Sequence, residues 1–411
     1  MTFIATPVKG MNDFLPSDMR LREHVLGLIK KTYAGYGFEQ IETPAVEHIE
    51  NLTGKVGGEN EKLIFKIMKR GEKLDLQNAK TEEDVADSGL RYDLTLPLAR
   101  YYANHASELP APFKALQIGG VFRADRPQRG RFRQFTQCDI DILGEPGYLA
   151  EIDLILATSL VLTKLDFHNF TIRINDRRLL KAMAANAGCK AEDYEKVFII
   201  VDKMDKIGRD GVREELMQLY PADTVECYLA QFGAEGEDGI ISETAAELMR
   251  ETGSPLPEII RTVDSVKQGD YRVLYDPTLV RGMGYYTGPI FEIAMDEYGG
   301  SVGGGGRYDE MIGKFIGQQV PAVGFSIGFE RIIMLLMERG FRVPGAGGKT
   351  AFLIEKKMPA DKLPEIWSQA MALRGEGQTV DIAVMKKNRK FQKDQLAAAG
   401  YTDIREFFGR T

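Results

Sequence analysis

A strand–loop–strand pattern runs from Phe113 to Gly144, and its second strand has one polar face and one apolar face. Side chains on a strand alternate between the two faces of a sheet. From Arg131 onward the odd positions carry two arginines, Phe135, an amide and two carboxylates, whereas the even positions from Cys138 onward are apolar. The apolar face belongs to the core. The pattern predicts an antiparallel hairpin whose polar face is either an ordinary solvated surface or a binding site.

Two arginine-bearing stretches favour a binding site. In the hairpin, Pro127–Gly130 predicts a flexible basic loop, and Arg123 lies just before it. A guanidinium presents a planar fork that suits phosphate or carboxylate oxygens. The second stretch, LVRGMGYYTG from Leu279, is followed by GGSVGGGGRYD at Gly299–Asp309. This glycine run is not a P-loop because no Lys-Ser/Thr follows it, and its glycines are expected to let the backbone approach a ligand.

Hydrophobic periodicity changes along the chain between helical and strand spacing. It predicts a helix over Ser17–Tyr36 followed by a single strand, FEQIETPAVE, and a long helix over Tyr148–Leu165. Helices separated by turns follow from Asp176 to Ser265, and strands resume afterwards. The stretch GFRVPGAGG is typical of a linker, and strand–helix–strand spacing beyond it predicts a small α/β module.

Bulk properties are those of a soluble globular protein with two or three domains: 411 residues, 44% hydrophobic and 27% charged. No stretch reaches membrane-spanning length, and the first residues are not a secretory signal. The three cysteines are dispersed, which favours a reducing cytoplasm over a disulfide framework or a zinc site. The net charge of −7 argues against a pure nucleic-acid-binding module but allows local basic patches.

Several motifs together carry a resemblance to a known family. FRADRPQRGRFRQFTQCDID resembles motif 2 of the class II aminoacyl-tRNA synthetases, and GFSIGFERI at Gly324–Ile332 resembles motif 3. LVRGMGYYTG and GGGGRYD are similar to the two histidine signatures of the histidyl-tRNA synthetase family, and VKGMNDFLP and LRYDLTLPLAR also fit it. Each motif is weak alone, but their occurrence in the family's order over roughly residues 5 to 340 is specific.

The resemblance implies an α+β fold: a class II antiparallel sheet flanked by helices, a helical insertion domain and a small C-terminal α/β module. The expected catalytic core has two parts, residues 1–175 and 266–340, and the helical insertion between them covers residues 176–265. A linker at residues 341–349 leads to a shortened anticodon-binding-like domain at residues 350–411. The implied setting is a cytoplasmic homodimer.

The resemblance also implies a role for four arginines in binding ATP, which would be used with Mg²⁺. Arg123 matches the motif 2 arginine that holds the α-phosphate, and Arg331 matches the motif 3 arginine at the far end of ATP. Arg281 matches the histidine-specific arginine that reaches the substrate carboxylate and the α-phosphate. Arg131 is expected to meet the remaining phosphates. Arg123, Arg281 and Arg331 are the implied catalytic residues, and no protein side chain is assigned to a metal.

For histidine, the resemblance implies one set of residues for the amino group and another for the ring. The amino-group residues are Asp93, Thr95 and Gln137, and the imidazole residues are Asp141, Tyr286 and Tyr308. Tyr285 is interpreted either as a core aromatic or as part of the site. For tRNA, local basic patches predict contacts at Arg126, Gln128, Arg129, Lys387 and Lys390.

The implied function is a histidine–tRNA ligase that makes histidyl-adenylate and transfers histidine to the 3′ end of tRNA(His). Two alternatives stay open at this point. One is a non-catalytic synthetase paralogue that senses histidine, such as the regulatory subunit of ATP phosphoribosyltransferase. The other is an enzyme that activates histidine but charges an acceptor other than tRNA.

Overall fold

A computed structural model describes residues 3–53, 58–233, 239–280, 284–344 and 348–409 of the chain. The chain forms two compact units, one of Met1–Asp13 with Val25–Gly340 and the other of Phe14–His24 with Phe341–Thr411. Across the described ranges, no helix combines the length and the apolar character that crossing a bilayer requires.

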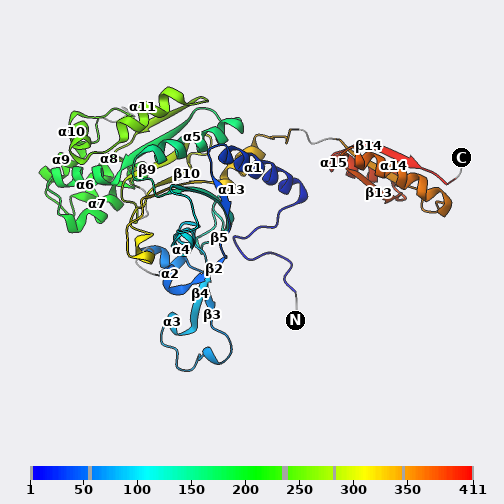
Figure 1. The fold of residues 1–411 in the computed structure, drawn as a ribbon, viewed down its shortest axis with the longest axis horizontal. Helices are drawn as coiled ribbons and strands as arrows, with labels where there is room; N and C mark the ends of the chain where they lie inside the picture. The colour runs from blue at the N-terminus through cyan, green and yellow to red at the C-terminus, as the bar shows by residue number, and fades with distance from the viewer. Residues whose placement is uncertain (1–2, 54–57, 234–238, 281–283, 345–347, 410–411) are drawn as a thin grey trace. The chain divides into compact units, whose positions relative to one another are not determined.

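A central sheet organises the larger unit (Figure 1). Within the described residues its eight strands lie in the order β1-β5-β6-β11-β10-β9-β7-β8. Every inner pair is antiparallel, whereas β1 is parallel to β5 at one edge and β8 is parallel to β7 at the other. The strand bounds are Glu39–Ile41 (β1), Phe113–Phe122 (β5), Gln134–Leu143 (β6), Phe170–Asp176 (β7), Tyr271–Tyr275 (β8), Pro289–Met295 (β9), Gly300–Arg307 (β10) and Ala322–Ile327 (β11). The expected α+β fold with a mainly antiparallel sheet is confirmed, and the parallel edges are an addition.

The predicted hairpin is present as β5 and β6. The two strands pair without interruption from Phe113 opposite Leu143 to Phe122 opposite Gln134. The even positions of β6 form its core face, with Cys138, Ile140 and Ile142 at most 1% exposed. The alternation in the sequence therefore gives the orientation of this strand correctly.

The prediction of one strand over FEQIETPAVE is wrong, because the segment divides between two sheets. Its first part is β1 in the central sheet, and its second part is β2 (Val46–His48) in a separate sheet of order β2-β4-β3. Pro44 lies between them, has no N–H to donate, and restricts the backbone of Thr43. The other two strands of the small sheet are β4 (Ala86–Leu90) and β3 (Lys66–Met68), and α2 (Ile49–Thr53) and α3 (Glu82–Val85) accompany them.

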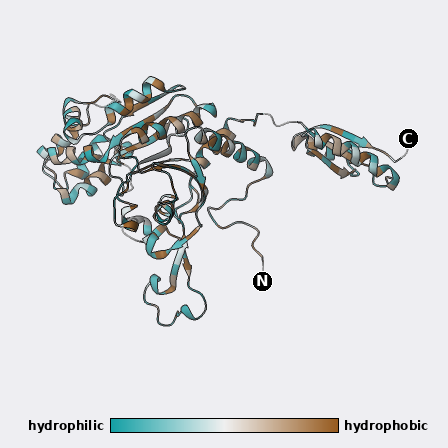
Figure 2. Cartoon of the chain, in the orientation of Figure 1, coloured by the Kyte–Doolittle hydropathy of each residue, from teal (hydrophilic) through white to brown (hydrophobic). Residues whose placement is uncertain are grey.

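Helices pack against the central sheet through apolar faces. The long helix α5 (Leu149–Lys164) is buried along most of its length and contacts β6 and β11. Helix α13 (Phe329–Glu338) contacts β6 and β10. Most helical ribbons in Figure 2 carry both hydrophobic and hydrophilic residues, as one-sided packing requires. Two further α-helices of this unit are α4 (Thr95–His105) and α12 (Gly313–Ile316), and the part of α1 (Pro16–Ala34) from Val25 onward also belongs to it.

Between β7 and β8 the chain forms only helices within its described part, drawn in green in Figure 1. They are α6 (Arg177–Asn186), α7 (Tyr194–Val201), α8 (Met204–Leu216), α9 (Ala222–Ala230), α10 (Glu243–Thr252) and α11 (Leu256–Val266). Asp176 joins this group to the sheet: its buried carboxylate caps α6 by accepting from the Arg178 N–H at 2.9 Å, and it accepts from the Ser254 hydroxyl at 2.8 Å.

The smaller unit contains the predicted α/β module. Three strands, β12 (Lys349–Ile354), β13 (Val380–Val384) and β14 (Tyr401–Phe407), lie in the order β13-β12-β14 and are all parallel. Helices α14 (Leu363–Gly375) and α15 (Arg389–Ala398) connect them. The core is built from Phe352, Ile354, Ile366, Ala370 and Val380.

Candidate functional site

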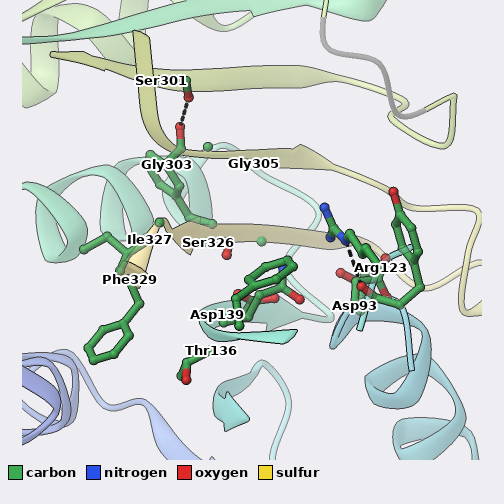
Figure 3. Close-up of a pocket in the computed structure, with 18 of the residues that line it drawn as sticks. Asp93, Arg123, Thr136, Asp139, Ser301, Gly303, Gly305, Ser326, Ile327 and Phe329 are labelled. Carbon is green, nitrogen blue, oxygen red and sulfur yellow. Dashed lines mark hydrogen bonds between the residues drawn. The ribbon is translucent and has the colours of Figure 1, made fainter. Parts of the chain in front are cut away.

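A cavity of about 500 Å³ opens on the central sheet of the larger unit. Its floor comes from β6, β10 and β11, and its walls come from the segment before α4, the residues that follow β5, and the start of α13 (Figure 3). Of the residues predicted for ATP and histidine, all that the structure describes line this one cavity: Asp93, Thr95, Arg123, Arg131, Gln137, Asp141, Tyr286, Tyr308 and Arg331. Arg281 lies outside the described residues.

The odd positions of β6 supply a row of acceptors to the cavity. Gln137, Asp139 and Asp141 follow each other on one face of the strand, and all three line the cavity. Within the described part of the chain, Gln137 Oε1, Asp139 Oδ1 and Asp141 Oδ2 are buried and have no hydrogen-bond partner. Buried polar atoms in folded proteins are nearly always paired. Unpaired acceptors that face one cavity therefore indicate a ligand that carries several donors.

Asp141 and Tyr308 form a buried acid–phenol pair. The Tyr308 hydroxyl donates to Asp141 Oδ1 at 2.6 Å, and the two side chains are 2% and 3% exposed, respectively. Burial raises the pKa of Asp141 to about 7, and the hydrogen bond from Tyr308 offsets part of that effect. Tyr308 occupies one oxygen of Asp141, and the other has no hydrogen-bond partner among the described residues.

A third carboxylate and two tyrosines form the side of the cavity next to α4. Asp93 accepts from the Leu96 N–H at 3.2 Å, so the first turn of α4 holds its position. Burial raises the pKa of Asp93, and the charge of Arg123 opposes that shift. The rings of Tyr285 and Tyr286 pack edge to face at 4.8 Å, and Tyr285 lies 6.1 Å from the Tyr308 ring. Both tyrosines line the cavity, so Tyr285 is part of its wall.

Arg123 is held in the cavity wall by contacts with a backbone carbonyl and two aromatic rings. Its Nε donates to the Tyr92 carbonyl at 3.0 Å, and its guanidinium carbon lies 4.2 Å from the centre of the Tyr92 ring. The Phe135 ring lies on its other side at 5.2 Å. These contacts fix the plane of the guanidinium and leave its terminal nitrogens for an anion.

Arg331, in the first turn of α13, is held by the opposite side of the cavity. Its guanidinium donates to the Ser301 carbonyl on β10 and lies 5.4 Å from the centre of the Tyr298 ring. Arg131 is exposed at the cavity mouth, where its backbone pairs with that of Gln128. The cavity therefore combines arginines in its wall with carboxylates on its floor.

The glycine-rich strands have a packing reason for their composition. A Cβ on Gly324 would collide with the Asp141 carboxylate, and a Cβ on Gly305 would collide with the backbone of Gly324. The run Gly303–Gly306 is therefore part of β10 and needs glycine where neighbouring strands approach closely. The same glycines also line the cavity, as the sequence prediction of an open backbone surface requires.

The residues predicted for tRNA occupy two separate surfaces. Arg126, Gln128 and Arg129 are exposed in the loop between β5 and β6. This loop is anchored to α13 and to the turn after β9. Arg129 pairs with Glu338 on α13 at 2.8 Å, and the Arg129 carbonyl accepts from the hydroxyl of Tyr298, which follows β9, at 3.2 Å. In the smaller unit, Lys387 and Lys390 are exposed near the start of α15.

Two residues line the cavity without a predicted role, Asp139 on β6 and Ser326, its neighbour across the β6–β11 pair. Gly324 also shapes the cavity, because its missing side chain makes room for Asp141. The alternation along β6 was the signal that could have identified Asp139, because it places this carboxyl between two predicted histidine ligands.

Comparison with known proteins matches this site to a family. A family model described as "Histidyl-tRNA synthetase" matches residues 10–332, which is most of the chain and includes every described residue of the cavity. The chain belongs to the histidyl-tRNA synthetase family. A relative from Leifsonia xyli subsp. xyli, named histidine–tRNA ligase, is 43% identical over 412 residues that cover 96% of this chain and 94% of the relative.

Solved structures of the histidyl-tRNA synthetase family share the fold. The histidyl-tRNA synthetase from Nostoc sp. PCC 7120 superposes with a TM-score of 0.78 at 27% identity, covering 97% of this chain and 90% of that chain. A protein from Bacillus halodurans C, described as an ATP phosphoribosyltransferase regulatory subunit/histidyl-tRNA synthetase, also has a TM-score of 0.78 but only 21% identity, with full coverage of both chains. The second likeness concerns the fold alone.

Proposed function

We propose that this protein is a histidine–tRNA ligase that activates histidine with ATP and transfers it to the 3′ end of tRNA(His). One observation carries the proposal beyond family membership. A single cavity combines a buried acid–phenol pair and unpaired acceptors with arginines oriented beside them. The acceptors suit the ammonium and imidazole of histidine, and the arginines suit the phosphates of ATP.

The first reaction joins two anions. A carboxylate oxygen of histidine attacks the α-phosphorus of ATP, the new P–O bond forms, and pyrophosphate leaves. Since the reactants repel each other, the protein contributes positioning and charge neutralisation. Arg123 would hold the α-phosphate and Arg331 the far end of ATP, each in an orientation already set by an aromatic ring. A ribose hydroxyl of the tRNA 3′ end then attacks the carbonyl carbon, and AMP leaves.

Selection of histidine depends on the acid–phenol pair. An imidazole ring needs a hydrogen-bond partner at each nitrogen. The free oxygen of Asp141 would accept from one ring N–H, and Tyr286 lies in the same cavity for the other nitrogen. A side chain without these nitrogens would leave Asp141 buried and unpaired, which is costly enough to reject it strongly.

Three further features of the function are proposals that rest on the family. ATP would enter with Mg²⁺, whose main ligands would be phosphate oxygens and water, as is common for this ion. Among the described residues no group of three or more His, Cys, Asp or Glu side chains is arranged to hold a metal. The protein would act as a homodimer. It would work in the cytoplasm, where its tRNA substrate is found.

A non-catalytic histidine sensor is the weaker alternative. A sensor needs acceptors for histidine but has no use for Arg123 and Arg331, which are held in place by dedicated contacts around the cavity. The likeness to the Bacillus halodurans protein does not favour a sensor either, because it concerns the fold alone.

Histidine-dependent exchange of pyrophosphate into ATP tests the proposal. Wild-type protein is expected to catalyse the exchange, and Arg123→Ala is expected to lower its rate roughly 100- to 1000-fold, the usual effect of removing one group that stabilises a transition state. Arg250→Ala, an exposed arginine on α10, is the matched control and should leave the rate unchanged. A wild-type protein that binds histidine but shows no exchange would instead support the sensor.

A further inference from the structure

Asp139 is the middle member of the acceptor row on β6, between Gln137 and Asp141. It is 5% exposed, it lines the cavity, and its Oδ1 has no hydrogen-bond partner among the described residues. A carboxyl group in this environment is costly, because burial and the neighbouring Asp141 both raise its pKa well above the usual range. Ser326 lies opposite Asp139 on β11, and a hydrogen bond with its side chain offsets part of that shift.

Asp139 is next to Gln137 on the face of β6 that lines the cavity, and Gln137 is predicted to bind the amino group of the substrate. Alternate residues of a strand are spaced by roughly 7 Å on one face. If Asp141 takes the imidazole and Gln137 takes the amino group, Asp139 lies between these two ends. Asp93 and Arg123, which lie beside each other in the cavity wall, are two further charged neighbours of Asp139 (Figure 3).

We propose that Asp139 accepts a hydrogen bond from the α-ammonium group of the amino-acid substrate, and so joins Asp93, Thr95 and Gln137, the residues predicted for this group. The inference rests on the proposed histidine substrate. An ammonium offers three N–H donors, and a carboxylate accepts from one of them in a charge-assisted hydrogen bond. The positive charge of the ammonium also compensates the two carboxylates, which Arg123 alone cannot do.

The groups around Asp139 support a cationic partner. The titratable and charged groups that interact with Asp139 are Asp141 on β6, Asp93 before α4, Arg123 after β5, Arg91 after β4, Tyr308 after β10 and Tyr33 on α1. Arg91 is already used, because it donates to the carbonyls of Gly120 and Thr43 at 2.8 and 2.7 Å. The carboxyls near the cavity floor therefore outnumber the cations left to balance them, and a bound ammonium corrects that imbalance.

Binding of two ligands distinguishes a contact of Asp139 with the ammonium group from a contact with the imidazole ring. Histidine and imidazolepropionate, which is histidine without its amino group, are titrated into wild type and Asp139→Asn by calorimetry, with the weaker ligand measured by competition at millimolar concentration. Asp139→Asn is expected to weaken histidine binding roughly 10- to 100-fold, the scale for losing a charged hydrogen-bond partner. Binding of imidazolepropionate should change less than about twofold. Asp223→Asn, an exposed position on α9, should change neither affinity.

Every other pattern overturns the inference. Equal losses for both ligands would place Asp139 at the ring, and no loss for histidine would remove it from the site. Asp139→Ser provides a smaller neutral side chain, and ATP affinity reports folding in both variants. If neither variant folds well enough to bind ATP, the sheet itself needs Asp139. A wild type without histidine-dependent exchange would contradict the proposed function separately, before any variant is compared.

Discussion

Asp141 carries most of the expected selectivity for histidine. Its Oδ1 is occupied by Tyr308, while its Oδ2 is buried without a partner. Asp141→Ala should weaken histidine binding by ~1–3 kcal/mol, because a ring N–H would then be buried without an acceptor. ATP binding should change little, since no phosphate contact is assigned to this residue. Calorimetric titration of each ligand checks both statements, and an unchanged histidine affinity would exclude Asp141 from the site.

The same residue makes the stability of the unliganded protein depend on pH. In the folded chain the pKa of Asp141 is about 7, above the value of ~3.9 for an exposed aspartate. Between these values the folded state binds more protons than the unfolded state, so this residue's contribution to stability decreases as pH rises. Asp141→Asn cannot ionise. Its free energy of unfolding should therefore rise relative to wild type from pH 5 to pH 8.

Urea unfolding at several pH values measures this difference. Asp223→Asn, which removes an exposed carboxylate, should show a constant difference from wild type over the same range. A constant difference for Asp141→Asn as well would mean that Asp141 ionises in the folded protein as it does in water.

Among the elements, α5 and β10 are joined by a fully buried ion pair. Arg307 at the end of β10 donates to both oxygens of Glu151 on α5, at 2.7 and 2.8 Å, and also to the Gly147 carbonyl at 2.8 Å. The residues are 6% and 0% exposed, respectively. Tyr308, whose hydroxyl donates to Asp141, follows Arg307 directly in the chain. The Arg307–Glu151 ion pair therefore also helps to hold Tyr308 in position.

Removing one partner of this pair should be strongly destabilising. Glu151→Ala leaves the buried Arg307 charge without its bidentate partner, although the Asp309 carboxylate is still 3.3 Å away, and should lower the free energy of unfolding by about 3–5 kcal/mol. The double variant Glu151→Leu/Arg307→Met should lose less than either single change, because both buried charges of the pair are removed together. Glu297→Ala, which breaks the more exposed pair with Arg339, is the control and should cost about 0–1 kcal/mol. Urea unfolding compares the variants, and a double variant as unstable as Glu151→Ala would contradict the argument.

Sequence patterns predicted the hairpin, the helices and the residues of the cavity because each depends on local periodicity or on a short motif. The break at Pro44 was missed because FEQIETPAVE keeps strand-like composition on both sides of it. The parallel edge strands were also missed, since pairing of β1 with β5 joins segments far apart in the chain. A role for Asp139 could not be predicted, because the argument for it depends on the burial of the side chain and on its unpaired oxygen. Both features arise only when the sheet packs.

For the chain as a whole, binding of tRNA is expected to use phosphate contacts in the smaller unit. A basic cluster, defined here as Lys386, Lys387, Arg389, Lys390 and Lys393, surrounds the start of α15. Lys393 pairs with Glu406 at 2.8 Å, and Arg389 lies 3.9 Å from the same carboxylate. Lys387 and Lys390 are exposed, and so they are the members most available for phosphate.

Reversing these two charges tests the contact. Lys387→Glu/Lys390→Glu should raise the KM for tRNA, and the effect should shrink as salt rises because contacts to phosphate are electrostatic. Pyrophosphate exchange needs no tRNA and should not change. Lys356→Glu/Lys357→Glu makes the same charge change elsewhere in the module and is the control. Equal KM values for wild type and the first variant at low salt would mean that the cluster is an ordinary solvated surface.

The close approach of Gly324 to Asp141 limits how this sequence can vary. Any side chain at position 324 would occupy the space of the carboxylate at position 141, although the two lie in separate motifs. Mutations at the two sites should therefore be strongly epistatic, with a larger residue at one tolerated only after a smaller residue at the other. Directed evolution toward an unnatural amino acid would have to treat the two codons as one locus and randomise them together.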